Sequence, residues 1–187
     1  MNIRVGVSNR HVHLLESDYE ILFGKNSRLT KRNDLSQDDE FASNDVVTIK
    51  TEAGVLNNVR VLGPFRNYTQ VEVSRTDSYT LGINPPIRKS GDISSSSQIT
   101  IIGPNSTLEL KEGAIIAERH IHVTKEQLAY YQLDENKPLN ILVQGEKPTI
   151  LNNVKLKVSD NAYFELHLDT DDANACNLRN GDIVDIL

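Results

Sequence analysis

Short runs in which apolar and polar residues alternate follow one another along the whole chain, separated by turns rich in Gly, Pro and Asn. This alternation is typical of β-strands that have one face in a hydrophobic core. The predicted strands are residues 2–7, 46–51, 55–62, 69–74, 98–102, 107–116, 139–143, 150–158, 162–168 and 181–187. Many short strands at even spacing are typical of barrels and sandwiches, and a closed barrel leaves no strand edge exposed. The pattern therefore predicts a mainly β protein.

A repeated histidine stretch organises the chain. The sequence RHVH at residues 10–13 returns almost unchanged as RHIH at residues 119–122, and the two copies contain four of the five histidines. On an extended strand, residues i and i+2 project from the same face, so the two imidazoles of each copy could bind one metal ion. A single H-x-H is weak support for a metal site, because lone histidines are usually surface or hydrogen-bonded residues. Two copies in a repeated context favour metal binding.

The string LNNV also occurs twice, at residues 56–59 and 151–154, and sixteen places after its Leu stand Glu72 and His167. Each half therefore carries an H-x-H pair, then LNNV, then one further candidate ligand. The candidate metal ligands are His11, His13, Glu72, His120, His122 and His167. Two histidines with a carboxylate, and three histidines, are ligand sets of catalytic zinc sites with an open fourth position. We expect two zinc ions per chain, although strand exchange between barrels would change which third ligand joins which pair.

Each H-x-H pair precedes a predicted short helix. Ser17 with Glu20, and Thr124 with Gln127, have the spacing of a capping box, and Gly24 is placed to end the first helix. The expected architecture is two tandem small β-barrels with short capping helices, internally duplicated.

The division expected between the two barrels falls between residues 104 and 105. Residues 1–104 would form the barrel with the first H-x-H pair, and residues 105–187 the barrel with the second. Residues 81–97, rich in Gly, Pro and Ser, read as a long loop, and long loops in compact domains are often functional.

Composition limits the possible partners and location. The net charge of −6 argues against non-specific nucleic-acid binding, whereas arginines near the middle of the chain could receive a small polyanion. Cys176 is the single cysteine, which suits a reducing compartment. The N-terminus runs directly into the first histidine stretch without a signal region, and no segment approaches the ~20 apolar residues of a membrane span. We expect a soluble cytoplasmic protein.

Eight segments match one family in order: SNRHVHL, DLSQ, VRVLGP, TQVEVSRTD, LGI, PIRKSGD, AERHIH and HLDTDDAN. They resemble the PduL-type phosphate propanoyltransferases, also called phosphotransacylases. The resemblance implies a two-barrel, zinc-dependent enzyme that exchanges coenzyme A and phosphate on a short acyl group, with the six ligands named above. It also implies that Arg66, in the GPxRxxTQVE pattern, binds phosphate. Family members that enter bacterial microcompartments carry an N-terminal extension, and the chain as given begins without one.

The residue types favour direct transfer of the acyl group. No serine has recognisable catalytic partners, and Cys176 has no histidine nearby in the sequence, so covalent catalysis has little support. Metal-bound phosphate would attack the thioester of acetyl-CoA or propanoyl-CoA and release CoA. Two alternatives stay open: a zinc-dependent hydrolase, and a non-catalytic zinc-binding module. We expect a homo-oligomer, with a dimer favoured.

Overall fold

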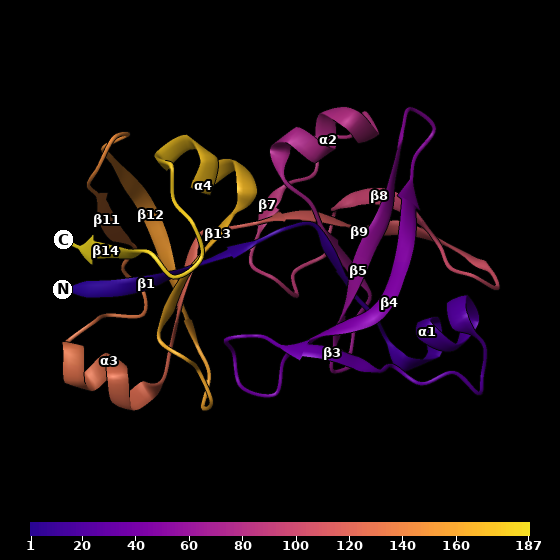
Figure 1. The fold of residues 1–187 in the computed structure, drawn as a ribbon, viewed down its shortest axis with the longest axis horizontal. Coiled ribbons are helices and arrows are strands. Elements are labelled where there is room, and N and C mark those ends of the chain that lie inside the picture. The colour runs from indigo at the N-terminus through magenta and orange to yellow at the C-terminus, as the bar shows by residue number, and fades with distance from the viewer. The chain divides into compact units, whose positions relative to one another are not determined.

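The computed structural model describes residues 1–187, which form fourteen strands and four short helices (Figure 1). The strands are β1 (Asn2–Ser8), β2 (His11–His13), β3 (Lys31–Asp34), β4 (Phe41–Lys50), β5 (Val55–Gly63), β6 (Gln70–Glu72), β7 (Ile87–Arg88), β8 (Ser97–Ile102), β9 (Thr107–Ala117), β10 (His120–Val123), β11 (Leu139–Val143), β12 (Thr149–Val158), β13 (Glu165–Asp169) and β14 (Ile183–Ile186). The helices are α1 (Glu16–Phe23), α2 (Arg75–Leu81), α3 (Lys125–Tyr131) and α4 (Thr170–Cys176). The prediction of a mainly β protein with short helices is confirmed.

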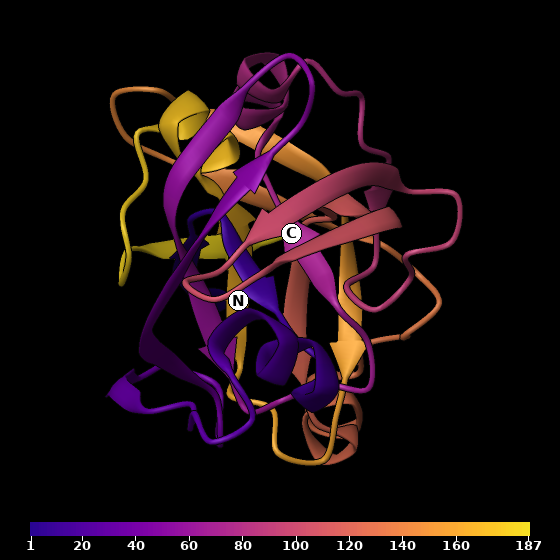
Figure 2. The same cartoon turned by 90° about the vertical axis from the view of Figure 1, so that its right-hand side faces the viewer.

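Two compact units make up the chain. Unit 1 consists of Met1–Asn9, Ser36–Asp38 and Glu118–Leu187, and unit 2 of Arg10–Leu35 and Asp39–Ala117. In unit 1 six strands close a barrel in the order β1-β13-β10-β12-β11-β14. In unit 2 the order β4-β5-β2-β6-β9 closes through β8, which pairs with both β4 and β9. Figure 2 views unit 2 with the β4–β5 hairpin (purple) beside the β8–β9 hairpin (salmon).

The two barrels share one strand topology. Each H-x-H strand, β2 or β10, runs parallel to the strand that contains LNNV and antiparallel to the strand of the third candidate ligand. The ligand strand in turn runs parallel to the long strand that leads into the other H-x-H pair, since β6 pairs with β9 and β13 with β1. The internal duplication inferred from the sequence is therefore a duplication of the barrel itself.

The observed units differ from the expected division between residues 104 and 105 at two strands. β1 pairs with β13 and β14, and its Ile3 and Val5 lie in the core of unit 1. β9 pairs with β6 and β8, and its Ala114 lies in the core of unit 2. Each half of the chain thus gives its first strand to the barrel of the other half. Apolar alternation specifies the face that a strand buries, and it does not specify the neighbour.

The LNNV string forms a β-bulge in both barrels. Its two asparagines stand opposite the single residue Thr48 in unit 2 and opposite Asn140 in unit 1, where the pairing register shifts. The second asparagine has a left-handed backbone in each copy, with φ of 57° at Asn58 and 61° at Asn153. Asn tolerates this conformation better than most residues, which explains why the string recurs.

The two helices predicted after the H-x-H pairs are present. The capping box of Thr124 and Gln127 on α3 is confirmed, as is Gly24 at the end of α1. The box of Ser17 and Glu20 is wrong, because α1 begins at Glu16 after Leu15 and has no side-chain cap.

Two helices, α2 and α4, were not predicted from the sequence. Each begins three residues after the third candidate ligand of its barrel. Ser74 caps α2 and Asp169 caps α4. Each of the four helices has seven or eight residues, far short of the ~20 that would span a lipid bilayer.

Candidate functional site

Unit 2 brings together the side chains of His11, His13 and Glu72. The middle residue of β2, Val12, points into the core, so the two histidines project from the opposite face, and Glu72 lies directly across from His11 on β6. The Nε2 atom of His11 lies 3.4 Å from one carboxylate oxygen of Glu72, and the Nε2 atom of His13 lies 3.9 Å from the other. All three side chains are buried, and their ligand atoms lie within 4.8 Å of one another.

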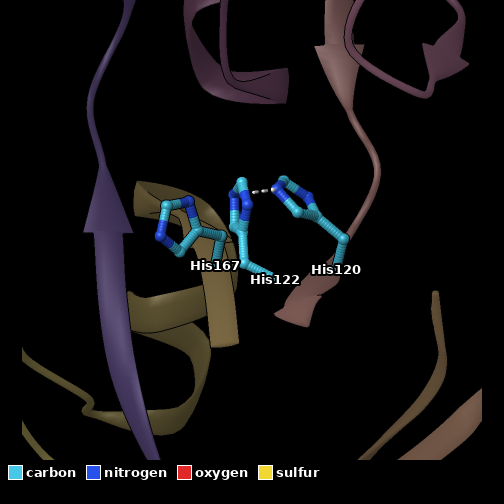
Figure 3. Close-up of side chains that lie close together, drawn as sticks. All are labelled: His120, His122 and His167. Carbon is cyan, nitrogen blue, oxygen red and sulfur yellow. Dashed lines mark hydrogen bonds between the residues drawn. The ribbon is translucent and has the colours of Figure 1, made fainter. Parts of the chain in front are cut away.

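Unit 1 brings together His120, His122 and His167 by the same register, with His120 opposite His167 (Figure 3). The Nε2 atoms of His120 and His122 are 3.1 Å apart. The Nδ1 atom of His120 lies 2.8 Å from the backbone oxygen of Glu118. Because a carbonyl oxygen can only accept, this contact makes Nδ1 the protonated nitrogen and leaves Nε2 with a lone pair. The structure thus pairs Glu72 with the strand of the first H-x-H pair and His167 with the strand of the second, as the repeat in the sequence indicated.

Both clusters fit zinc by donor type and spacing. Four tetrahedral ligands at ~2.0–2.2 Å from zinc stand roughly 3.3–3.6 Å from one another. Three of the separations between ligand atoms, 3.1, 3.4 and 3.9 Å, lie close to that range, and within each cluster all of them are at most 4.8 Å. Each cluster supplies three nitrogen or oxygen donors, which is the donor count of a zinc site that keeps one position for water or substrate.

Glu72 is held in place by a buried network. The side-chain amide of Gln70 donates to Glu72 Oε1 at 2.7 Å, and the Ser90 hydroxyl donates to the same oxygen at 2.8 Å. The backbone N–H of Gly91 fixes Gln70 in turn, at 2.8 Å from Oε1. Ser90 and Gly91 belong to the PIRKSGD segment, so the loop after α2 orients this carboxylate.

A further carboxylate, Glu165, lies beside the three-histidine cluster and was missed in the sequence analysis. One of its oxygens is 2.9 Å from His167 Nε2 and also accepts from the Ser36 hydroxyl, and the other lies 3.8 Å from Arg4 Nε. Burial alone would raise the pKa of this carboxyl, but the hydrogen bonds from His167 and Ser36 and the charges of His167 and Arg4 lower the pKa below its usual value. Glu165 is 3% exposed and is held as an anion next to a candidate ligand.

The arginine before each H-x-H pair binds the helix that follows the third ligand. Arg10 Nε donates to Asp77 at 3.0 Å, and Arg119 donates to both carboxylate oxygens of Asp172 at 2.8 and 2.6 Å. Both aspartates occupy the third position of their helices. The only sequence signal for these partners was the spacing S-x-x-D and D-x-x-D at the start of α2 and α4.

The sequence model of the phosphate propanoyltransferase family matches residues 4–179. The chain belongs to this family. The resemblance drawn from the sequence segments is thereby confirmed.

Several phosphate propanoyltransferases align over nearly the full chain. The protein of Thermotoga maritima is 45% identical over 186 residues, which cover 99% of this chain and 89% of the relative. The protein of Priestia megaterium is 48% identical over 180 residues, covering 96% and 83%. The protein of Salmonella typhimurium is 40% identical over 179 residues, covering 95% and 85%.

Arg66 is the candidate phosphate ligand. It lies in unit 2, between β5 and β6. Its backbone N–H donates to the Leu14 carbonyl at 2.9 Å, one residue after the H-x-H strand. Its guanidinium donates to Glu40, a partner that the sequence analysis did not anticipate. The Nε atom of Arg66 is buried and has no hydrogen-bond partner within the chain.

Cys176 lies at the end of α4 with its side chain in the core of unit 1. Burial, together with the charge of Asp172, raises the pKa of this thiol. A buried thiol with a raised pKa is a poor nucleophile, so Cys176 is poorly suited to covalent catalysis.

Proposed function

We propose that this chain transfers a short acyl group, propanoyl or acetyl, between coenzyme A and inorganic phosphate, with zinc at both three-residue clusters. Membership of the phosphate propanoyltransferase family over residues 4–179 supports the reaction. The observation that carries the proposal is the pair of clusters, each of which supplies the three nitrogen or oxygen donors of a catalytic zinc site.

The proposed zinc ligands are His11, His13 and Glu72 in unit 2 and His120, His122 and His167 in unit 1. When bound, zinc would supply a Lewis acid that polarises the thioester carbonyl and stabilises oxyanion charge. Arg66 would bind phosphate, because its planar guanidinium can donate to two phosphate oxygens at once. Its contact with Glu40 holds the side chain in place before phosphate arrives.

The acyl group would pass directly from sulfur to phosphate. A phosphate oxygen attacks the carbonyl carbon, the carbon–sulfur bond breaks, and CoA leaves as a thiolate that takes a proton from solvent. Neither a strong base nor a protein nucleophile is needed, because phosphate is largely dianionic near neutral pH and a thiolate is a good leaving group. Holding the two reactants in attack geometry can contribute ~7–11 kcal/mol.

Release of CoA from propanoyl-CoA, measured with and without phosphate, separates the candidate functions. The proposal predicts release that requires phosphate and forms propanoyl phosphate. A zinc hydrolase would release CoA at the same rate in both conditions, and a binding module would release none.

The role of Arg66 can be tested by Arg66→Ala. Loss of a charged hydrogen-bonding group at the phosphate should lower kcat/KM for phosphate roughly 10–100-fold while bound zinc is retained. Arg60→Ala is the matched control, because Arg60 donates to the backbone oxygens of Ser43 and Asn44 and has no proposed role in phosphate binding. Normal phosphate kinetics in Arg66→Ala would make the assignment wrong, and Arg75 would be the next candidate.

A further inference from the structure

The two barrels place one polar residue in the same position relative to the third candidate ligand. Gln70 precedes Glu72 by two residues on β6, and Glu165 precedes His167 by two residues on β13. The strand registers agree, because Gln70 lies opposite His13 and Glu165 opposite His122. Residues two apart on a strand share one face, so each polar side chain lies beside its ligand.

The chemistry of the two pairs is complementary. Gln70 presents an N–H donor to a carboxylate, at 2.7 Å from Glu72 Oε1. Glu165 presents a carboxylate acceptor to an imidazole, at 2.9 Å from His167 Nε2. Where the third ligand is an acceptor its neighbour donates, and where the third ligand carries a ring N–H its neighbour accepts. A role in core packing alone would not require this match.

A short segment from the β3–β4 loop fixes Glu165. The Ser36 hydroxyl donates to the Glu165 oxygen that also faces His167. The next residue, Gln37, is buried and anchors the segment, donating to the Tyr163 carbonyl at 3.0 Å and accepting from the Tyr163 N–H at 3.1 Å. Both residues belong to the DLSQ segment, which the zinc ligands and Arg66 leave without a role.

We propose that Glu165, held by Ser36, is a positioning residue that orients His167 for metal binding. With His167 Nε2–H donating to Glu165, the lone pair at Nδ1 is left for the metal, and Figure 3 shows one ring nitrogen of His167 facing His122 and the other pointing away. A carboxylate behind a ligating imidazole fixes the ring and makes it a better donor, and loss of such a partner lowers metal affinity 10–100-fold in other metal sites. The proposal rests on the proposed function, since it requires that the three-histidine cluster binds metal.

The test uses Co²⁺ as the probe, titrated into metal-free protein and followed by its visible absorption, with NMR of the histidine ring protons on the same samples. The wild type should bind two Co²⁺, and the Nε2 proton of His167 should give a downfield, hydrogen-bonded signal. Glu165→Leu should lose that signal and bind one of the two ions roughly 10–100-fold more weakly. Glu165→Gln, whose amide oxygen can still accept, should keep the signal and show a smaller loss of affinity.

Gln70→Leu is the matched control. It should weaken the other ion and leave the His167 signal unchanged. Unaltered affinity for both ions in Glu165→Leu and Glu165→Gln would overturn the positioning role and leave the proposed function intact. A wild type that binds no ion at the three-histidine cluster would overturn both.

Discussion

Gly6 lies on β1 directly opposite His167, and the space beside it is filled by the side chains of Glu165 and His167. A Cβ atom at this position would lie 2.7 Å from Glu165 Oε2 and 3.1 Å from His167 Cδ2. The equivalent position in unit 2, opposite Glu72 on β9, is occupied by the buried residue Ile115. The glycine is therefore required by this cluster and is not a general feature of the barrel.

Gly6→Ala should lower the free energy of unfolding by about 1–3 kcal/mol, because Glu165 is fixed by Ser36 and His167 and cannot move without losing hydrogen bonds. Each kcal/mol should lower Tm by roughly 2–4 °C in a chain of this length. The same displacement should weaken one metal ion about 10-fold or more, since it moves the group that orients His167.

The assay is thermal unfolding of the wild type and each variant, in metal-free and zinc-loaded form. The metal-free form of each protein is also titrated with metal. Gly113→Ala on β9 is the control, because the three atoms nearest to its Cβ would all belong to the side chain of Leu110, and the nearest is the flexible Cδ1 end. Gly113→Ala should lower the free energy of unfolding by no more than about 1 kcal/mol and leave both ions bound. If Gly6→Ala matched Gly113→Ala in stability and in metal affinity, the crowding described around Glu165 would be refuted.

Three further predictions concern the bulge, the cysteine and a buried tyrosine. Asn153→Ala should destabilise the protein by about 1 kcal/mol in denaturant unfolding, whereas Asn153→Gly should be near neutral, because φ is 61° there; equal losses would contradict this account of LNNV. Cys176→Ala should keep near-normal acyl transfer, and mass spectrometry after incubation with acyl-CoA alone should find no acyl adduct on any residue. Burial and Asp45 raise the pKa of Tyr19 from 10.0 to about 12, so the unfolded chain ionises first and stability should fall by up to about 2–3 kcal/mol between those pH values. Tyr19→Phe should lose less stability than the wild type over this pH range. An identical pH profile of stability in the two proteins would exclude the contribution of Tyr19.

The sequence predicted the candidate ligands because they sit in a repeat. The spacing from LNNV to Glu72 and to His167 is the same, and the structure gives both residues the same register against their H-x-H strands. Repetition makes a weak short pattern specific, so the six ligands could be predicted. All six side chains fall into the two clusters.

The strand exchange could not be predicted in the same way. On β1 the buried residues Ile3 and Val5 alternate with exposed ones, and β9 ends in a buried run at residues 113–116. Neither pattern specifies the barrel that receives the strand. Their partners follow from chain connectivity and register, which hydrophobic alternation does not encode.

The short helices α2 and α4 were missed because seven residues give no clear helical periodicity, and only their caps mark them. Glu165 was missed because an acidic residue in an alternating strand resembles the solvent face. Its hydrogen-bond partner Ser36 is distant in sequence, so the sequence gives no sign of the contact.

Stepwise zinc addition to metal-free protein, with propanoyl phosphate formation measured after each addition, tests the central claim most directly. The account predicts that the metal-free protein is inactive, that phosphate-dependent transfer returns with zinc, and that activity reaches its plateau at two zinc ions per chain. Full transfer activity in protein shown by elemental analysis to be free of metal would contradict the proposed roles of both clusters.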